Sequence, residues 1–65
     1  MITLHLHLIV AIDGITLAIF SMPKGYQFSV IDNKGQVYQP QLLFEEPEAA
    51  ERQGREWIYA NFLVD

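Results

Sequence analysis

The chain has 65 residues and a net charge of −4, from 4 Lys and Arg against 8 Asp and Glu, so residues 1–65 are expected to form a single small domain. So few cations argue against binding to nucleic acid or to anionic lipid, because both partners attract clustered positive charge. There is no cysteine, which excludes disulfides and thiolate metal sites and fits a reducing compartment, and we therefore expect a cytoplasmic protein.

Apolar residues recur at every second position from Leu4 to Ile12, and again from Ile15 to Ile19. This period of two predicts two strands, and Asp13-Gly14 between them predicts a two-residue hairpin turn with Gly14 as a structural residue. Closing that turn predicts the following cross-strand pairs: Ile12 with Ile15, Val10 with Leu17, Leu8 with Ile19, Ala11 with Thr16, Ile9 with Ala18, and His7 with Phe20. One face of the hairpin is then continuously aliphatic.

The same hairpin contains the longest apolar run of the sequence, residues 8–20. Asp13 interrupts this run, and a membrane-spanning helix needs roughly 20 apolar residues. No Lys or Arg precedes the run, unlike the start of a signal peptide. We therefore expect strands here, and neither a membrane anchor nor a leader.

Turn residues divide the next part of the chain. Pro and Gly in residues 21–25 predict a loop, followed by a third strand over residues 26–32. Asn33-Lys34-Gly35 predicts a hairpin loop with Gly35 in the left-handed conformation, and a fourth strand over residues 36–39. Residues 41–45 are expected to be extended, so the sheet has four or five antiparallel strands.

A C-terminal helix is predicted to pack on one face of this sheet, which gives an α+β fold. Pro47 suits the first helical position, since its missing N–H costs nothing there. Expected on the buried face are Ala50, Gly54, Trp57, Ile58 and Asn61. Gly54 at the centre of that face predicts a close approach of the helix to the sheet, and Trp57 is expected to pack in the core.

Ion pairs at i,i+4 are predicted for Glu48 with Arg52 and for Glu51 with Arg55. Asn61 is expected to end the helix in the left-handed conformation. The apolar tail at residues 62–64 must then pack on something.

An ordered set of residues runs through the second half of the chain: Tyr26-Gln27-Phe28, the turn Asn33-Lys34-Gly35, Phe44, Ala49-Ala50-Glu51 and Gly54. In this order the stretch 26–58 resembles one unit of the YegP-like family of small bacterial proteins. Gly54 stands one residue later than in that family, and Arg55 replaces the apolar residue that usually follows it. The resemblance implies a strand–strand–strand–helix unit that pairs with a second such unit, and it carries no biochemical activity.

His5 and His7 form an H-x-H pair, which alternation places on one face of a strand. Two imidazoles on one face suit a metal site, but a third ligand is needed, and only the fold could bring Asp13 or Asp32 close enough. The alternative is that both histidines are polar residues on the solvent side of an amphipathic strand. A metal- or ligand-binding protein using His5 and His7 is therefore the second functional hypothesis.

The sequence contains no motif typical of a catalytic nucleophile or of a phosphate-binding loop. Ser21 and Ser29 lack a nucleophile-elbow context, and Lys24-Gly25 and Lys34-Gly35 fit turns rather than a phosphate loop. We expect no enzyme activity and no cofactor.

Hydrophobic residues make up 51% of the chain, more than so small a domain is expected to bury. The first functional hypothesis is therefore a non-catalytic interaction module, acting as a homodimer or as an accessory subunit of another protein. Its contact is expected in the N-terminal hairpin or in the C-terminal tail. The candidate contact residues are Ile9, Phe20, Tyr59, Phe62 and Leu63.

Overall fold

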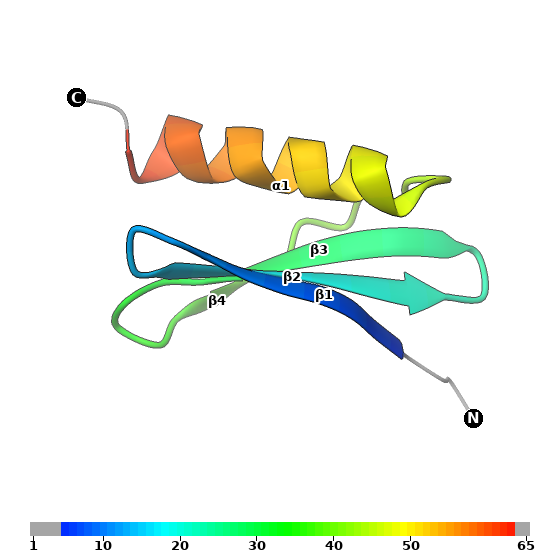
Figure 1. Ribbon diagram of the computed structural model, residues 1–65, viewed down its shortest axis with the longest axis horizontal. Helices are drawn as coiled ribbons and strands as arrows, with labels where there is room; N and C mark the ends of the chain where they lie inside the picture. The colour runs from blue at the N-terminus through cyan, green and yellow to red at the C-terminus, as the bar shows by residue number, and fades with distance from the viewer. Residues whose placement is uncertain (1–4, 64–65) are drawn as a thin grey trace.

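The computed structural model describes residues 5–63, which form a four-stranded antiparallel sheet with one helix packed on it (Figure 1). The elements in chain order are β1 (His5–Ile12), β2 (Ile15–Met22), β3 (Gly25–Ile31), β4 (Val37–Tyr38) and α1 (Pro47–Asn61). The strands are neighbours in the order β1-β2-β3-β4, so each strand follows its predecessor in space. The predicted α+β class with a C-terminal helix is confirmed.

The first hairpin has the predicted register over most of its length. Ile12 pairs with Ile15, and the pairing continues in step as far as Leu8 opposite Ile19. Asp13 and Gly14 form the turn with φ of 50° and 82°, the positive values that a type I′ turn requires. The alternation of apolar residues and the two-residue turn indicate the same pairing of β1 with β2, so residues close in the sequence are enough to set the register.

The predicted pairing of His7 with Phe20 is wrong, because the register shifts between Leu6 and Leu8. Leu6 is the residue opposite Phe20, and His7 is the extra residue of a β-bulge. A bulge adds one residue to one strand only, so simple alternation fails for the residues before it.

The loop predicted over residues 21–25 is also wrong, since it is much shorter. β2 runs to Met22, β3 begins at Gly25, and these two residues pair directly. Pro23 and Lys24 alone form the turn, where the missing N–H of Pro23 breaks no ladder.

The chain after β3 contributes less strand than predicted. β4 has only two residues, Val37 and Tyr38, and residues 41–45 form no strand. A single bridge joins this segment to the sheet: the N–H of Phe44 donates to the Tyr26 carbonyl at 2.9 Å, and the N–H of Tyr26 donates back at 2.8 Å. Pro40 cannot donate to a ladder, which explains why regular pairing stops before it.

The core lies between α1 and the face of the sheet that carries Leu17 and Phe28. Buried there are Ile15, Leu17, Ile19, Phe28, Val30, Ala50 and Ile58. Gly54 is buried as well, and a Cβ at this position would stand 2.5 Å from Leu17 Cδ1 and 3.3 Å from Phe28 Cγ. The predicted close approach of helix and sheet at Gly54 is therefore confirmed.

The C-terminal end of α1 differs from the prediction in two respects. Asn61 is exposed, and its side-chain amide donates to the Trp57 carbonyl at 2.8 Å. The residue that caps the helix is Phe62, with φ of −124°, so the predicted left-handed end is wrong. Of the two predicted ion pairs, the described residues form only Glu51–Arg55, with Arg55 Nη2 2.9 Å from Glu51 Oε2.

Candidate interaction surface

Strand β1 combines an apolar sequence with a lack of burial. Six of its eight residues are apolar (HLHLIVAI), yet none of the eight is buried. In the neighbouring strand β2, four of eight residues are buried. A strand gains its stability from partners on its edges and faces, so within the described chain β1 leaves much of its apolar surface without a partner.

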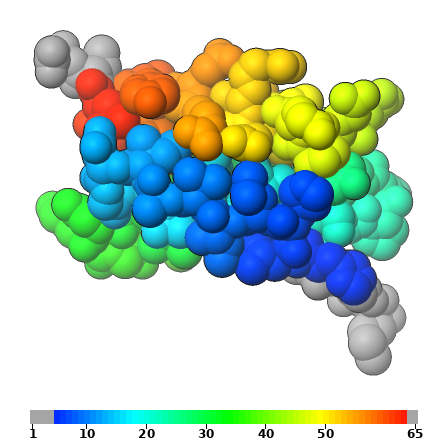
Figure 2. All heavy atoms as spheres, viewed as in Figure 1, coloured from blue at the N-terminus to red at the C-terminus, as the bar shows by residue number. Residues whose placement is uncertain are grey.

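The position of α1 explains this difference. The helix packs mainly against β2 and β3, so the aliphatic side chains that β1 directs to the same face remain only half-buried. These residues are Leu8, Val10 and Ile12. Figure 2 shows the atoms of β1 (blue) forming the near side of the molecule below the helix.

The opposite face of the sheet, called the open face below, is uncharged among the described residues. By register its side chains are Leu6, Ile9, Ala11, Thr16, Ala18, Phe20, Met22, Gln27, Ser29, Ile31 and Val37. Exposure is uneven across it: Ala18 and Ser29 at the centre are 5% exposed, whereas Ile9 on β1 is 57% and Val37 on β4 is 60% exposed. The exposed apolar surface of the open face therefore gathers at the two edges of the sheet.

Among the described residues, the outer edge of β1 has little of the usual protection. Proteins block exposed edges with Lys, Pro, inward-pointing charges or short strands, because unpaired N–H and C=O groups attract further strands. β1 has eight residues, with no Lys, Pro or acidic residue among them. A bulge at His7 is its one protective feature, and it lies near the beginning of the strand.

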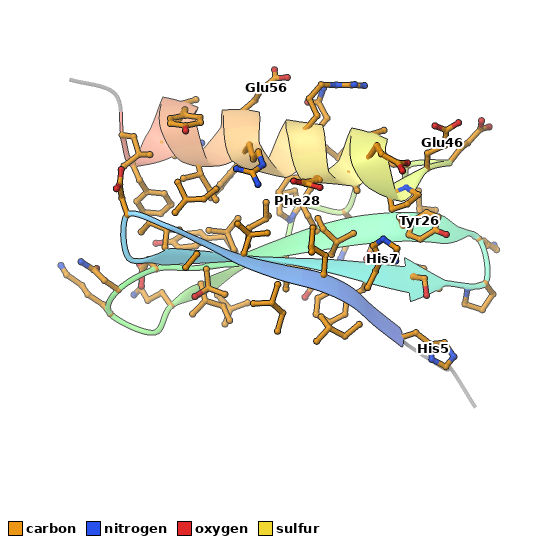
Figure 3. The ribbon with its side chains drawn as sticks, viewed as in Figure 1. His5, His7, Tyr26, Phe28, Glu46 and Glu56 are labelled. Atoms are coloured by element: carbon orange, nitrogen blue, oxygen red, sulfur yellow. The ribbon has the colours of Figure 1, made fainter. Side chains whose placement is uncertain are left out.

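Of the predicted metal ligands, His7 lies beside Tyr26, with ring centroids 5.8 Å apart in an edge-on arrangement (Figure 3). Because of the bulge, simple alternation no longer relates the two imidazoles. Asp13 follows the opposite end of β1 from His5, so it does not join them. Residues 5–63 contain no group of three or more His, Cys, Asp or Glu side chains that could hold a metal ion.

The predicted contact residues in the C-terminal part of the chain fall into two groups. Phe62 and Leu63 are half-buried against the core, and the Phe62 ring lies 5.8 Å from that of Trp57 and 5.5 Å from that of Tyr38. Trp57 is itself half-buried in this aromatic cluster rather than at the centre of the core. Tyr59 is different, since it lies on the outer side of α1 and is 53% exposed. Phe62 and Leu63 thus pack part of their apolar surface against the core of their own chain.

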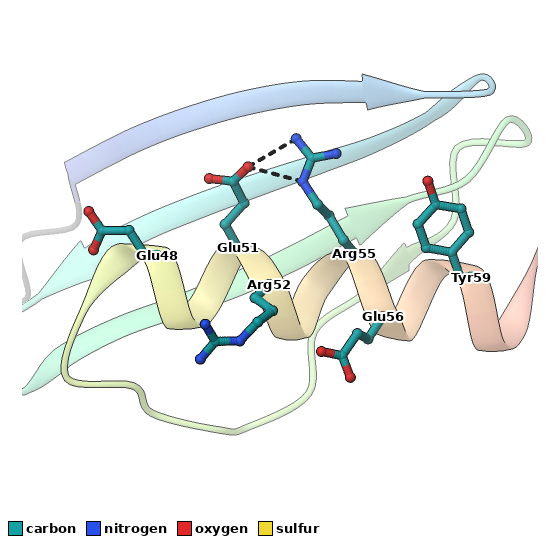
Figure 4. A pocket seen from close by; sticks show the side chains of 6 residues that line it. All are labelled: Glu48, Glu51, Arg52, Arg55, Glu56 and Tyr59. Atoms are coloured by element: carbon teal, nitrogen blue, oxygen red, sulfur yellow. Dashed lines mark hydrogen bonds and ion pairs between the residues drawn. The ribbon is translucent and has the colours of Figure 1, made fainter.

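A depression of about 320 Å³ lies along the outer side of α1 (Figure 4). Its lining consists of Glu48, Glu51, Arg52, Arg55, Glu56 and Tyr59. The Glu51–Arg55 pair is an ordinary i,i+4 contact between partly exposed side chains. Mixed charges at helical spacing are typical of a solvated helix face, and this lining fits that description.

The loop between β3 and β4 is organised by Asp32. Its Oδ1 accepts hydrogen bonds from the N–H groups of Lys34 and Gln36, each at 2.9 Å, and its Oδ2 accepts one from the Tyr38 hydroxyl at 3.2 Å. The Gln36 N–H, and to a lesser degree that of Lys34, lower the pKa of Asp32. Partial burial and the Asp32 carboxylate raise the pKa of Tyr38. Gly35 in this loop has φ of 86°, as predicted.

Within residues 5–63 no helix has the length and apolar character needed to cross a membrane. Comparison of the chain with protein-family models, with curated proteins and with solved structures gave no match. The resemblance of residues 26–58 to the YegP-like family therefore stays a prediction.

Sequence patterns named Ile9 and Phe20 as candidate contact residues but did not single out Leu8, Val10 and Ala11, which the structure leaves half-buried or exposed on β1. Alternation assigns residues to faces of a sheet, whereas the lateral order of strands and the position of the helix decide which strand is left uncovered. The absence of Lys and Pro from residues 5–12 was the one available signal of an open edge.

Proposed function

We propose that this chain is a non-catalytic interaction module that acts as a homodimer through β1. The observation that carries the proposal is that β1 is mostly apolar and yet none of its residues is fully buried: five are exposed, and Leu8, Val10 and Ile12 are only half-buried. Burial of apolar surface drives association at about 25 cal/mol per Å² before the costs of binding, so this strand is where contact with a partner gains most.

Charge supports the same location. Two copies that each carry a net charge of −4 repel one another, and this repulsion is smallest where the contact itself is uncharged. β1 has no Asp, Glu, Lys or Arg, whereas the outer side of α1 carries three Glu and two Arg around its depression. An uncharged strand at the edge of an acidic molecule therefore favours β1 over the helix as the contact between copies.

Sedimentation velocity across a dilution series tests the proposal. The wild-type chain is expected to form a dimer that dissociates on dilution. Ile9→Lys is expected to shift the equilibrium to monomer, because it places a charge on the exposed apolar surface of β1. Leu42→Lys is the matched control, since Leu42 is 52% exposed and lies outside the sheet. A wild-type chain that stays monomeric at every concentration would contradict the proposal.

A further inference from the structure

We infer that two copies join edge to edge, with β1 of one chain pairing antiparallel to β1 of the other, so that the two four-stranded sheets become one eight-stranded sheet. This inference rests on the proposed homodimer and specifies its geometry. It begins from the outer edge of β1, where residues 8–12 beyond the bulge at His7 include no Lys, Pro or acidic residue.

The first step concerns the backbone. Along an edge strand, every second residue directs its N–H and C=O groups away from its only neighbour. In the described chain β1 has β2 on one side and no strand on the other. A second β1 supplies matching donors and acceptors, because an antiparallel pair of identical strands is related by a two-fold axis and each chain uses the same groups.

The second step fixes the register. β1 is regular only between the bulge at His7 and the turn that begins at Asp13, so an undistorted ladder can use residues 8–12. Its centre is Val10, and a two-fold axis there places Val10 opposite Val10 of the second copy. Residues directly opposite one another share a face, so the remaining pairs are Leu8 with Ile12 and Ile9 with Ala11. Every pair in this register is apolar.

The third step concerns the helix-facing side of the new sheet. Each α1 packs on β2 and β3 and leaves its own β1 incompletely covered (Figure 1). In the dimer the half-buried side chains of Leu8, Val10 and Ile12 meet their counterparts between the two helices. On the open face, Ile9 of each chain lies against Ala11 of the other. Both faces of β1 thus gain apolar contact at once.

The fourth step identifies the occupant as a second copy. A different partner would need a strand with a matching apolar pattern on both faces, whereas β1 matches itself in the register centred at Val10. A second copy also brings no charge to the ladder, because residues 8–12 contain none. The self-complementary sequence and the uncharged edge together select another copy of this chain.

Single-cysteine cross-linking tests the register, because the chain contains no cysteine of its own. Opposite residues in an antiparallel pair have Cα atoms about 4.5–5.5 Å apart, within the range of a disulfide. Val10→Cys is therefore expected to form a covalent dimer under mild oxidation. Val37→Cys is the matched control, the same substitution on the opposite edge strand β4 at a more exposed site. It is expected to remain mostly monomeric on a non-reducing gel.

Ala11→Lys provides an independent measurement. Ala11 is exposed, so the substitution is compatible with the monomer fold, but the two-fold axis brings two lysines into one ladder. The variant is expected to sediment as a monomer with an unchanged far-ultraviolet circular dichroism spectrum. Val37→Lys on the other edge is expected to leave the dimer intact.

The outcomes separate this inference from the proposed function. A wild-type monomer overturns both. A wild-type dimer that survives Ala11→Lys, or that cross-links through Val37→Cys and not through Val10→Cys, overturns the edge pairing and leaves the homodimer standing. Cross-linking through Val10→Cys with loss of the dimer in Ala11→Lys supports both.

Discussion

Gly54 shows how one residue sets the distance between two layers of this protein. Glycine inside a helix costs about 1 kcal/mol relative to alanine, so its presence needs a compensating gain. That gain is close packing, since the position faces Leu17 and Phe28 and has no room for a Cβ. Ala50 and Ile58 are fully buried on the same side of α1, which depends on this short distance.

Replacing Gly54 by Leu is expected to destabilise the fold by about 1–3 kcal/mol or more, because overpacking forces the helix from the sheet. In a domain of this size, 1 kcal/mol lowers the melting temperature by roughly 4–8 °C. Gln53→Leu is the control, since Gln53 is the exposed neighbour on the same helix. Thermal unfolding followed by circular dichroism measures both, and a Gly54→Leu variant that melts like the wild type would show that this helix face is not packed as described.

The hairpins show how much local chemistry decides at the scale of an element. Asp13-Gly14 closes the first hairpin through backbone conformation, with positive φ at both residues. The β3–β4 loop has backbone hydrogen bonds from Asp32 to Gln36 and from Gly35 to Asp32, and a side chain strengthens it: the Asp32 carboxylate accepts from two N–H groups of the loop and from the hydroxyl of Tyr38. The hydrogen bonds of the Asp32 carboxylate depend on its ionisation, whereas the backbone conformation of the Asp13-Gly14 turn does not.

The lowered pKa of Asp32 makes the stability of this loop depend on pH. A carboxyl group whose pKa is lower in the folded state contributes stability above its unfolded pKa of about 3.9, and this contribution disappears as the pH falls through the lowered value. Wild type is therefore expected to be more stable than Asp32→Asn at neutral pH, and the difference is expected to shrink under acid conditions. Chemical denaturation at neutral and acid pH measures it, with the exposed Glu56→Gln as control. A difference that stays constant over this range would contradict the role of the ionised carboxylate.

At the scale of the whole molecule, one 15-residue helix has to cover a sheet of four strands. It packs mainly against β2 and β3. Exposed large apolar residues remain at both edges of the sheet, Leu6 and Ile9 on β1 and Val37 on β4, and also at Ile31, Leu42, Leu43 and Tyr59. A domain of this length buries only about 60% of the surface of its unfolded chain, so association is a physical means to complete its core.

Association predicts a melting temperature that rises with protein concentration. Binding that occurs only in the folded state adds up to about 1.4 kcal/mol per mole of dimer for each tenfold rise in concentration. The wild type is expected to show this dependence, and Ala11→Lys is expected to melt at one temperature throughout. Scanning calorimetry at several concentrations checks it, and a wild-type curve independent of concentration would argue against a dimer.

Several elements of the fold could be predicted because short-range physics determined them. Alternation and the Asp13-Gly14 turn gave the register of the first hairpin, and Pro47 marked the start of α1. The bulge at His7 and the two-residue turn at Pro23 were missed, because neither has a signature that distinguishes it from regular strand or longer loop. The extent of β4 was missed because Pro40 limits pairing without showing where it stops.

The sequence alone determined the turn and most of the register of the first hairpin, the presence of the C-terminal helix, and that Gly54 must face the sheet. Those properties follow from periodicity, turn conformation and side-chain volume, which act over a few residues. Only the tertiary structure decided that β1 is an edge strand, that α1 leaves it partly uncovered, and that Phe62 packs against Tyr38 and Trp57. These features depend on the lateral order of strands and on where the helix packs, and both are properties of residues distant in the chain.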